Sequence, residues 1–411
     1  MNFESTLPPL PEGSVRLLRA LAAVGGLIIL AGVLFAPERI WPSLLLVTYF
    51  LVCTALAGAF FVALQYVAGA GWSVALRRVP ETLAMLLPAA GAALILVLLA
   101  RPSLYPWAVH DSAYVALQGF KALWLNRPFF LARAAVYLAL WIGLALAIVR
   151  TSRRQDSDGA IEHTLRNEKL SAVFIVVFAL TFWPAAFDWI MSLEPHWSST
   201  IFGVYNFAGM FLSGLATIIV LTVWLERLGP LHGVLNDNHL HDLGRLLFAF
   251  STFWAYIWFS QYMLIWYANF PEETVYYTRR LHGAWQPLFL LNFFLNWVVP
   301  FFILLMRASK RSATTLMRVA VFVLVGRWLD LYLMIVPPHA GDWPPFGVWE
   351  VGPAVAAVAL GLLASFHYLR QAPIIPVRDP LLAESLAQSD TPKPSRVSAG
   401  SSKDFFQAGV G

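Results

Sequence analysis

One short stretch of the chain, residues 187–206, holds several side chains that are able to carry a proton. Asp188, Glu194 and Tyr205 lie within it, and apolar runs flank it on both sides. A charge at a lipid boundary is costly, so an ionisable residue there is a candidate functional residue. We therefore interpret these three side chains as candidates for proton transfer, close to where one membrane span ends and the next begins. The competing interpretation is that they are solvated or make only local hydrogen bonds.

A second set of polar side chains falls inside the apolar runs. Arg327 and Asp330 are three residues apart, so they either neutralise each other across one helical turn or take part in proton transfer. Gln261 either belongs to the same set or makes a hydrogen bond between helices. Counting about 1.5 Å per helical residue places most of these groups in the outer half of their spans, as a hydrated cavity that opens outward would require. The proton-path candidates are Asp188, Asp330, Arg327, Gln261, Tyr205, Glu194, Thr181 and Thr252.

The composition is that of an integral membrane protein. Hydrophobic residues make up 59% of the 411 residues and charged residues 12%, against about 25% charged residues in an ordinary globular domain. The mean hydropathy is +0.67. The basic residues lie between apolar runs, where they set orientation in a membrane and do not indicate nucleic-acid binding.

The residues that usually hold redox cofactors are scarce. The single cysteine, Cys53, excludes an internal disulfide, a cysteine-held iron–sulfur cluster and a covalently attached haem. The histidines fall in loops or at the ends of spans, which disfavours a facing pair of axial haem ligands within the bilayer. We therefore expect no metal and no redox cofactor in this chain.

Ten apolar runs are long enough to cross a bilayer, which takes about 20 residues per helix. Backbone groups in lipid must be hydrogen-bonded within their own segment, so we expect an all-α polytopic protein. The expected organisation is an inner N-terminal segment (1–16), a transmembrane domain (17–368) and a polar, largely disordered inner tail (369–411). The ten expected spans are 17–35, 44–67, 82–100, 129–149, 171–191, 201–224, 246–268, 286–306, 313–334 and 350–368.

The distribution of positive charge predicts that both termini lie inside. With that orientation, 20 of the 28 Lys and Arg residues fall in inner segments, six in outer segments and two, Arg133 and Arg327, within spans. Positive charge favours the inner side of a membrane, so the asymmetry supports ten spans. Within the fifth span, Pro184 removes a backbone hydrogen bond, and we expect it to break the helix.

Several motifs then point to one family. The stretches FDWIMSLEPHW (187–197), HDLGRLLFAF (241–250), FWAYIWFSQYMLIWYAN (253–269) and RDPLLAESL (378–386) resemble those of the ActF-type membrane subunits of alternative complex III, a quinol:cytochrome c oxidoreductase, within the NrfD/PsrC-like family. The resemblance covers residues 170–386 strongly and the first 160 residues in topology only. It implies two four-helix bundles, spans two to five and six to nine, with spans one and ten at the periphery.

The resemblance also implies a function and partners. The chain would be a multi-pass subunit in the bacterial cytoplasmic membrane that conducts protons or acts as a scaffold, and quinol would be the substrate of the complex. The implied partners are a sister ten-helix subunit (ActC-like), an outer iron–sulfur protein (ActB-like), c-type cytochrome subunits, small membrane subunits and lipids. Haem c and iron–sulfur clusters would belong to those other subunits.

Two alternatives remain open from the sequence. In the first, the chain itself binds quinol, with His282 and Tyr262 around the headgroup. In the second, the chain is a secondary transporter, for which broken helices at equivalent positions of two repeats would be expected.

Overall fold

The computed structural model describes residues 7–109 and 119–387, and every regular element in those ranges is a helix. Each of the ten predicted runs falls on helical structure. The corresponding helices are α1 (Glu12–Phe35), α2 (Pro37–Val67), α3 (Arg78–Met85) with α4 (Leu87–Ala100), α6 (Arg127–Asp158), α7 (Ile161–Trp189), α8 (Phe202–Arg227), α9 (Asp237–Ala268), α11 (Gln286–Phe293) with η6 (Phe294–Val298) and α12 (Val299–Leu305), α14 (Ala313–Ile335) and α15 (Val348–Leu369).

Eight helical segments are long and apolar enough to cross a membrane. The chain is therefore a helical integral membrane protein. Of the ten helical regions above, α9 and α14 are the two outside that group. These are the helices that carry Gln261 and the charged pair Arg327 and Asp330.

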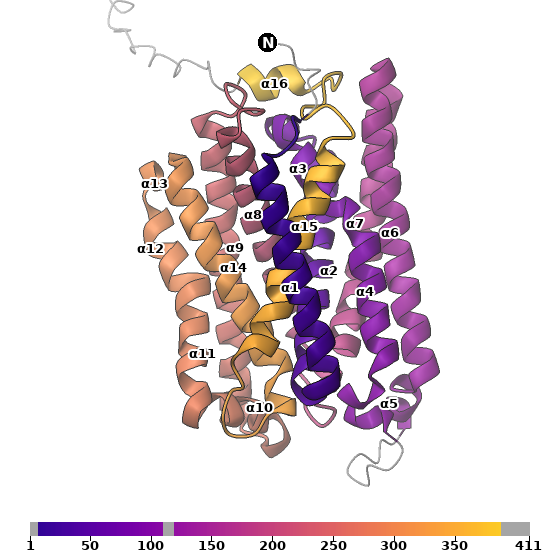
Figure 1. Cartoon of the computed structure of the whole chain (residues 1–411), viewed down its shortest axis with the longest axis vertical. Helices are drawn as coiled ribbons and strands as arrows, with labels where there is room; N and C mark the ends of the chain where they lie inside the picture. The colour runs from indigo at the N-terminus through magenta and orange to yellow at the C-terminus, as the bar shows by residue number, and fades with distance from the viewer. Residues whose placement is uncertain (1–6, 110–118, 388–411) are drawn as a thin grey trace, which may run out of the picture.

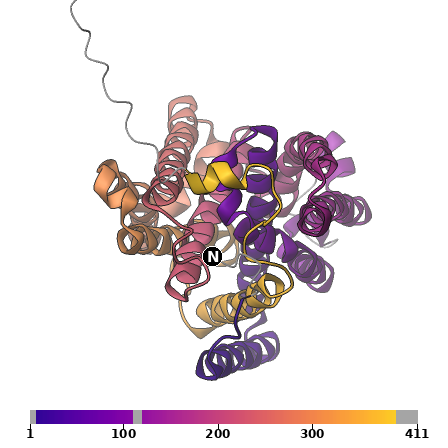
Figure 2. The same ribbon diagram turned by 90° about the horizontal axis from the view of Figure 1, so that it is seen from above.

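The long helices run roughly parallel to one axis and pack into two neighbouring groups (Figures 1 and 2). In the first group, α2 packs against α3, α4 and α7, while α6 packs against α4 and α7. In the second, α8 packs against α9 and α14, and α11 and α12 lie against α14 and α9. Contacts of α2 with α8 join the groups, and α2 and α8 are the most deeply buried of the long apolar helices.

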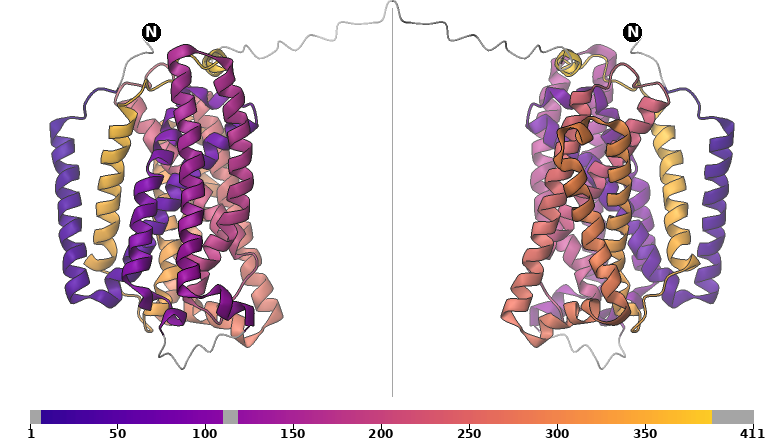
Figure 3. Two further views of the ribbon diagram at one scale, coloured as in Figure 1. Left: turned by 90° about the vertical axis from the view of Figure 1, so that its right-hand side faces the viewer. Right: turned by 90° about the vertical axis from the view of Figure 1, so that its left-hand side faces the viewer.

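Helices α1 and α15 stand beside the two groups. Helix α1 packs mainly against α15, and the two form a separate layer at one side of the molecule (Figure 3). Large apolar side chains along α1, such as Leu27 and Leu34, are exposed. In a membrane these side chains face lipid, where apolar side chains need no hydrogen-bond partner.

The two ends of the bundle differ (Figure 1). At one end, the short helix α16 (Leu382–Ala387) packs on the 3₁₀-helix η1 (Gly71–Leu76); we call this the α16 end. At the other lie α5 (Gly119–Trp124) and α10 (Pro271–Leu281); we call this the α10 end. The part of the expected tail up to residue 387 therefore packs on the bundle, and residues 388–411 lie outside the described ranges.

Helix α7 does not break at Pro184. It continues as one α-helix from Ile161 to Trp189 with Pro184 inside it, so the predicted break is wrong. The neighbouring Thr181 hydroxyl donates to the Val177 carbonyl (2.6 Å) and accepts from Trp141 Nε1 of α6 (2.8 Å). Packing between α6 and α7 thus holds the helix where the sequence suggested a discontinuity.

Close packing of α8 on α2 depends on a glycine, and this gives a test of the interface. A Cβ atom at Gly214 would lie 2.1 Å from the Ala57 Cβ, so we expect Gly214→Ala to lower the free energy of unfolding by about 1–3 kcal/mol. Gly143→Ala is the matched control, because Gly143 lies in α6 with open space around it and alanine favours a helix by about 1 kcal/mol. Thermal unfolding of the detergent-purified chain should move in opposite directions for the two variants; a Gly214→Ala protein as stable as the original would contradict this packing.

Candidate functional site

Asp188 is fully buried near the last residue of α7 and is held by two side chains from the preceding elements. Arg133 of α6 makes a two-point ion pair with it, Nε to Oδ2 at 2.8 Å and Nη2 to Oδ1 at 2.9 Å. Trp124 Nε1 of α5 donates to Oδ1 at 2.7 Å. The Arg133 guanidinium also stacks over the rings of Trp124 and Phe129 at 4.1 and 4.4 Å. Both carboxylate oxygens of Asp188 are therefore occupied in a rigid arrangement.

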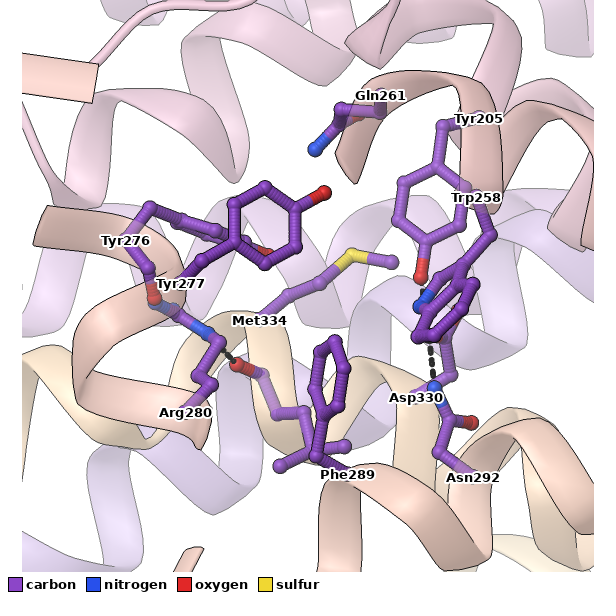
Figure 4. Close-up of a pocket in the computed structure, with 11 residues that line it drawn as sticks. Tyr205, Trp258, Gln261, Tyr276, Tyr277, Arg280, Phe289, Asn292, Asp330 and Met334 are labelled. Carbon is purple, nitrogen blue, oxygen red and sulfur yellow. Dashed lines mark hydrogen bonds between the residues drawn. The ribbon is translucent and has the colours of Figure 1, made fainter. Parts of the chain in front are cut away.

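Asp330 forms a second buried site, between four helices of the second group. Its carboxylate pairs with Arg327 one turn earlier on α14 and accepts hydrogen bonds from the Tyr205 hydroxyl of α8 and from Asn292 Nδ2 of α11 at 2.7 Å. Trp254 Nε1 of α9 lies 3.4 Å from Oδ2. Figure 4 shows Tyr205 and Asn292 on either side of Asp330. One carboxylate thus ties together α8, α9, α11 and α14.

A glycine makes room for the charge next to Asp330. The Arg327 guanidinium lies against α8 at Gly209, where a Cβ atom would come within 2.1 Å of Nη2. Any larger residue at that position would displace the guanidinium from Asp330. The pairing therefore depends on Gly209 as much as on the i, i+3 spacing of Arg327 and Asp330.

A small cavity of about 10 Å³ adjoins the Asp330 site. That volume holds about one water molecule. Tyr205, Gln261, Asn292 and Asp330 contribute polar groups to its lining (Figure 4). The Oε1 atom of Gln261 is buried with no hydrogen-bond partner among the described residues. The cavity thus offers a single polar position beside a buried acid.

Glu194 reaches the same region through Arg280. Arg280 Nη2 of α10 donates to Glu194 Oε1 at 2.7 Å, and its other nitrogens donate to the carbonyls of Leu333 and Tyr276 at 2.7 and 2.8 Å. The guanidinium lies 3.5 Å from the centre of the Tyr276 ring. Because Arg280 also lines the cavity, Glu194 belongs to the rim of the Asp330 site.

From Asp330 a chain of hydrogen bonds runs along α11 and η6 toward the α16 end. Asn292 donates to Asp330, Asn296 Nδ2 donates to Asn292 Oδ1 at 2.7 Å, and Ser251 Oγ of α9 donates to the Asn296 carbonyl at 2.5 Å. Asn296 lies in η6, a π-helical turn, a local distortion that is frequent at functional sites. This row of hydrogen bonds extends from Asp330 into the interior of the second helix group.

The structure therefore assembles most of the predicted proton-path residues, but in two sites. Asp330, Arg327, Gln261, Tyr205 and Glu194 lie together. Asp188 stands apart from them with Arg133, a residue that the sequence placed in a span without a role. Thr181 lies on the Asp188 helix and bonds to Trp141, as described above. The Thr252 hydroxyl donates to the Phe248 carbonyl of its own helix, whereas the neighbouring Ser251 donates to the Asn296 carbonyl. Successive side chains of a helix point about 100° apart, so the two hydroxyls point in different directions.

The two residues of the quinol alternative do not face the cavity beside Asp330. His282 is exposed, and its Nδ1 lies 2.9 Å from the Thr278 carbonyl of α10. Tyr262 packs its ring edge-on against Tyr277, with centroids 5.2 Å apart. Neither is among the residues that line the cavity.

A further charged cluster lies at the α16 end of the first group. Arg78 pairs with Glu81 (2.5 Å) and with Asp156, while Arg77 pairs with Asp379 of the tail and donates to the Tyr66 hydroxyl at 2.9 Å. The sequence predicted that both arginines lie in a segment between two spans, yet both are buried. The sequence signal that identifies this cluster is Glu81, an acid one turn after an arginine pair and directly before an apolar run.

Metal ligands do not gather anywhere in residues 7–109 and 119–387: no group of three or more His, Cys, Asp or Glu side chains is placed to hold a metal ion. Cys53 is buried as a free thiol. The side chains gathered at the sites above are carboxylates, guanidinium groups, amides and hydroxyls.

The Arg133–Asp188 pair allows a direct test of its energetic role. Arg133→Leu leaves a fully buried carboxylate without its cation, so we expect the free energy of unfolding to fall by about 3–5 kcal/mol. The double variant Arg133→Leu, Asp188→Leu should recover most of that loss, because apolar replacement of a buried pair is often neutral. Arg101→Leu is the control, since its partner Glu38 is largely exposed and such pairs contribute about 0–1 kcal/mol. Equal losses for Arg133→Leu and Arg101→Leu in thermal unfolding would refute the assignment.

No family model matches the chain, and no curated protein matches it. The geometry identifies a helical integral membrane protein in which the buried acids Asp188 and Asp330 lie at the α10 end. Its function is therefore inferred from the chemistry of those sites, together with the sequence motifs.

Proposed function

We propose that this chain is an ActF-type membrane subunit of a multisubunit quinol:electron-acceptor oxidoreductase in the bacterial cytoplasmic membrane, and that it carries part of a proton path. The observation that supports the path most directly is the Asp330 site. There, a buried carboxylate shared by four helices adjoins a cavity that holds about one water molecule.

A purely structural role explains the Asp330 site less well. A buried ion pair is weak evidence for stability, because removing two charges from water offsets most of their attraction. Here the pair also recruits Tyr205 and Asn292 and is continued by Asn296 and Ser251. The Tyr205 hydroxyl and Asn292 Nδ2 both donate to the carboxylate, and the cavity leaves space for about one water molecule beside it. A structural pair requires none of these additions.

The size of the cavity distinguishes proton transfer from quinol binding at this site. An apolar cavity of about 150 Å³ holds a benzene ring, whereas the cavity beside Asp330 measures about 10 Å³. It accommodates water and no quinol headgroup. Because His282 and Tyr262 also lie outside it, we do not assign quinol binding to the residues named in the quinol alternative.

The same proposal places the chain in the membrane. We propose that α9 and α14 cross the bilayer as well, because each runs beside α8 and buries its polar groups against neighbouring helices. Ten spans with both termini inside put the α16 end inside and the α10 end outside. The iron–sulfur and c-type cytochrome partners would then dock at the α10 end, over the Asp188 and Asp330 sites, and a sister ten-helix subunit would pack at the side.

The transporter alternative predicts broken helices at equivalent positions of two repeats, and the continuous α7 offers no such break at Pro184.

Asp330→Asn tests the path, because it preserves the shape of the side chain and removes the proton-accepting carboxylate. In the intact complex, reconstituted into vesicles, we expect protons moved per electron to fall by more than half while quinol oxidation continues. The matched control is Asp342→Asn, at an exposed loop position.

Two outcomes would count against the proposal. An Asp330→Asn complex with an unchanged proton-to-electron ratio would remove Asp330 from the path. A chain that purifies from its membrane without any cytochrome or iron–sulfur subunit would contradict the assignment to this class of complex.

A further inference from the structure

Positive charge gathers at the α16 end of the second helix group, where the chain passes from α12 to α14. The connection is a short helix, α13 (Arg307–Arg311), and three of its five residues are basic: Arg307, Lys310 and Arg311. Figures 1 and 2 show α13 at the outer edge of the bundle. The basic residues therefore lie at a helix end on the perimeter of the molecule.

Close packing fixes α13 on the start of α9. A Cβ atom at Gly244 would lie 3.0 Å from the Lys310 Cβ, so the two backbones meet at a position where no side chain separates them. Arg311 Nη2 donates to Asn238 Oδ1 of α9 at 3.1 Å. Lys310 Nζ donates to the Leu304 carbonyl at 2.7 Å and so caps the end of α12. The position of α13 is therefore set by contacts with both neighbouring helices.

This packing brings the charges of two helices together. Arg245 of α9 and Arg307 and Lys310 of α13 all lie within electrostatic range of His241. We call these three basic residues, together with Arg311, the α13 patch. Arg245 and Arg307 are its exposed members.

The nearby acids do not balance the α13 patch. Asp242 lies 3.4 Å from Arg245 Nη1, and Asp237 is exposed at the first position of α9. Counting both acids against the four basic residues still leaves a net positive charge. Arg307 makes no ion pair with any residue of the ranges 7–109 and 119–387. An anion can therefore bind here without displacing a carboxylate from Arg307.

An apolar surface leads directly to the α13 patch. Phe302 and Met306 are each 63% exposed and Leu305 is 58% exposed, at the end of α12 and just before Arg307. In a bilayer these side chains contact acyl chains, while arginines at a helix end reach the headgroups. A phospholipid fits both features, with its phosphate at the arginines and its chains along α12.

The net charge of the α13 patch selects among phospholipids. A guanidinium group binds phosphate oxygens through two parallel hydrogen bonds, so any phospholipid phosphate meets suitable donors. The ammonium group of a zwitterionic lipid, however, enters a region of excess positive charge and is repelled. A headgroup whose only charge is negative avoids that repulsion, and basic pockets beside membrane helices suit such headgroups.

We propose that the α13 patch binds the headgroup of an anionic phospholipid, with the phosphate on Arg245 and Arg307 and the acyl chains along the end of α12. The site requires only that the chain lies in a membrane, and it is independent of the proton path and of the partners proposed above.

Native mass spectrometry of the full chain, purified in detergent and titrated with one lipid at a time, tests the site. We expect phosphatidylglycerol to bind at least fivefold more tightly than phosphatidylcholine. The double variant Arg245→Gln, Arg307→Gln should weaken phosphatidylglycerol binding by about fivefold for each arginine removed and leave phosphatidylcholine binding unchanged. Lys310 stays in place because it caps α12.

Arg19→Gln, Arg166→Gln is the matched control. These two arginines are exposed on α1 and on the first turns of α7, so their replacement removes the same charge and leaves the α13 patch intact. The affinity for phosphatidylglycerol should then change by less than about twofold, since each lost charge contributes about one fivefold factor only where the lipid binds. Thermal unfolding of each variant verifies that it is folded.

Three outcomes would overturn this assignment. The first is equal affinity for the two lipids, and the second is a folded Arg245→Gln, Arg307→Gln variant that binds phosphatidylglycerol as tightly as the original. The third is displacement of bound phosphatidylglycerol by millimolar inorganic phosphate at constant ionic strength, which would identify a site for free phosphate. The proton measurement on Asp330→Asn involves none of these residues, so the two tests succeed or fail separately.

Discussion

A charge buried among membrane helices must be neutralised where it lies, and the Arg133–Asp188 pair shows how strongly that constraint shapes this bundle. Breaking such a pair leaves an unpaired buried charge and costs about 3–5 kcal/mol, so α5, α6 and α7 are held together at one point. In the second group, the hydrogen bonds that Asp330 of α14 accepts from Tyr205, Asn292 and Trp254 join α8, α11 and α9 to α14, and Arg280–Glu194 ties α10 to the segment between α7 and α8. Buried carboxylates at the α10 end therefore hold neighbouring helices together through ion pairs and hydrogen bonds.

Asp188 and Asp330 differ in their surroundings, and in our proposal the difference gives them different roles. Asp188 is enclosed by a two-point guanidinium contact and a tryptophan, which suits a fixed structural pair. Asp330 adjoins a water-sized cavity and a row of hydrogen-bonding side chains, which suits exchange of a proton. The same residue type thus serves structure in one helix group and, in our proposal, transport in the other. Tyr49 connects the groups, since its hydroxyl donates to Asn206 at 3.1 Å and its ring packs on Trp189.

Apolar run length was sufficient to predict where the helices lie, because a bilayer-sized run of apolar residues has few other stable conformations. It also indicated that Asp330, Arg327, Gln261 and Tyr205 would share a depth, since rise per residue is fixed in a helix. The prediction that Pro184 breaks its helix was wrong, because packing of α6 against α7 keeps the helix continuous. Depth alone also grouped Asp188 with Asp330, although depth does not say which helices are neighbours.

The sequence by itself determined the class of protein, the positions of its helices and which polar residues lie within them, because hydropathy and helical rise are local properties. Only the tertiary structure decided which charges meet. Arg133 lies 55 residues from Asp188, Arg280 lies 86 from Glu194 and Arg77 lies 302 from Asp379. A second cavity, lined in part by Pro42 and His339, likewise forms between the start of α2 and the turn after α14. Contacts across such separations depend on how helices pack, and no local pattern in the chain encodes that.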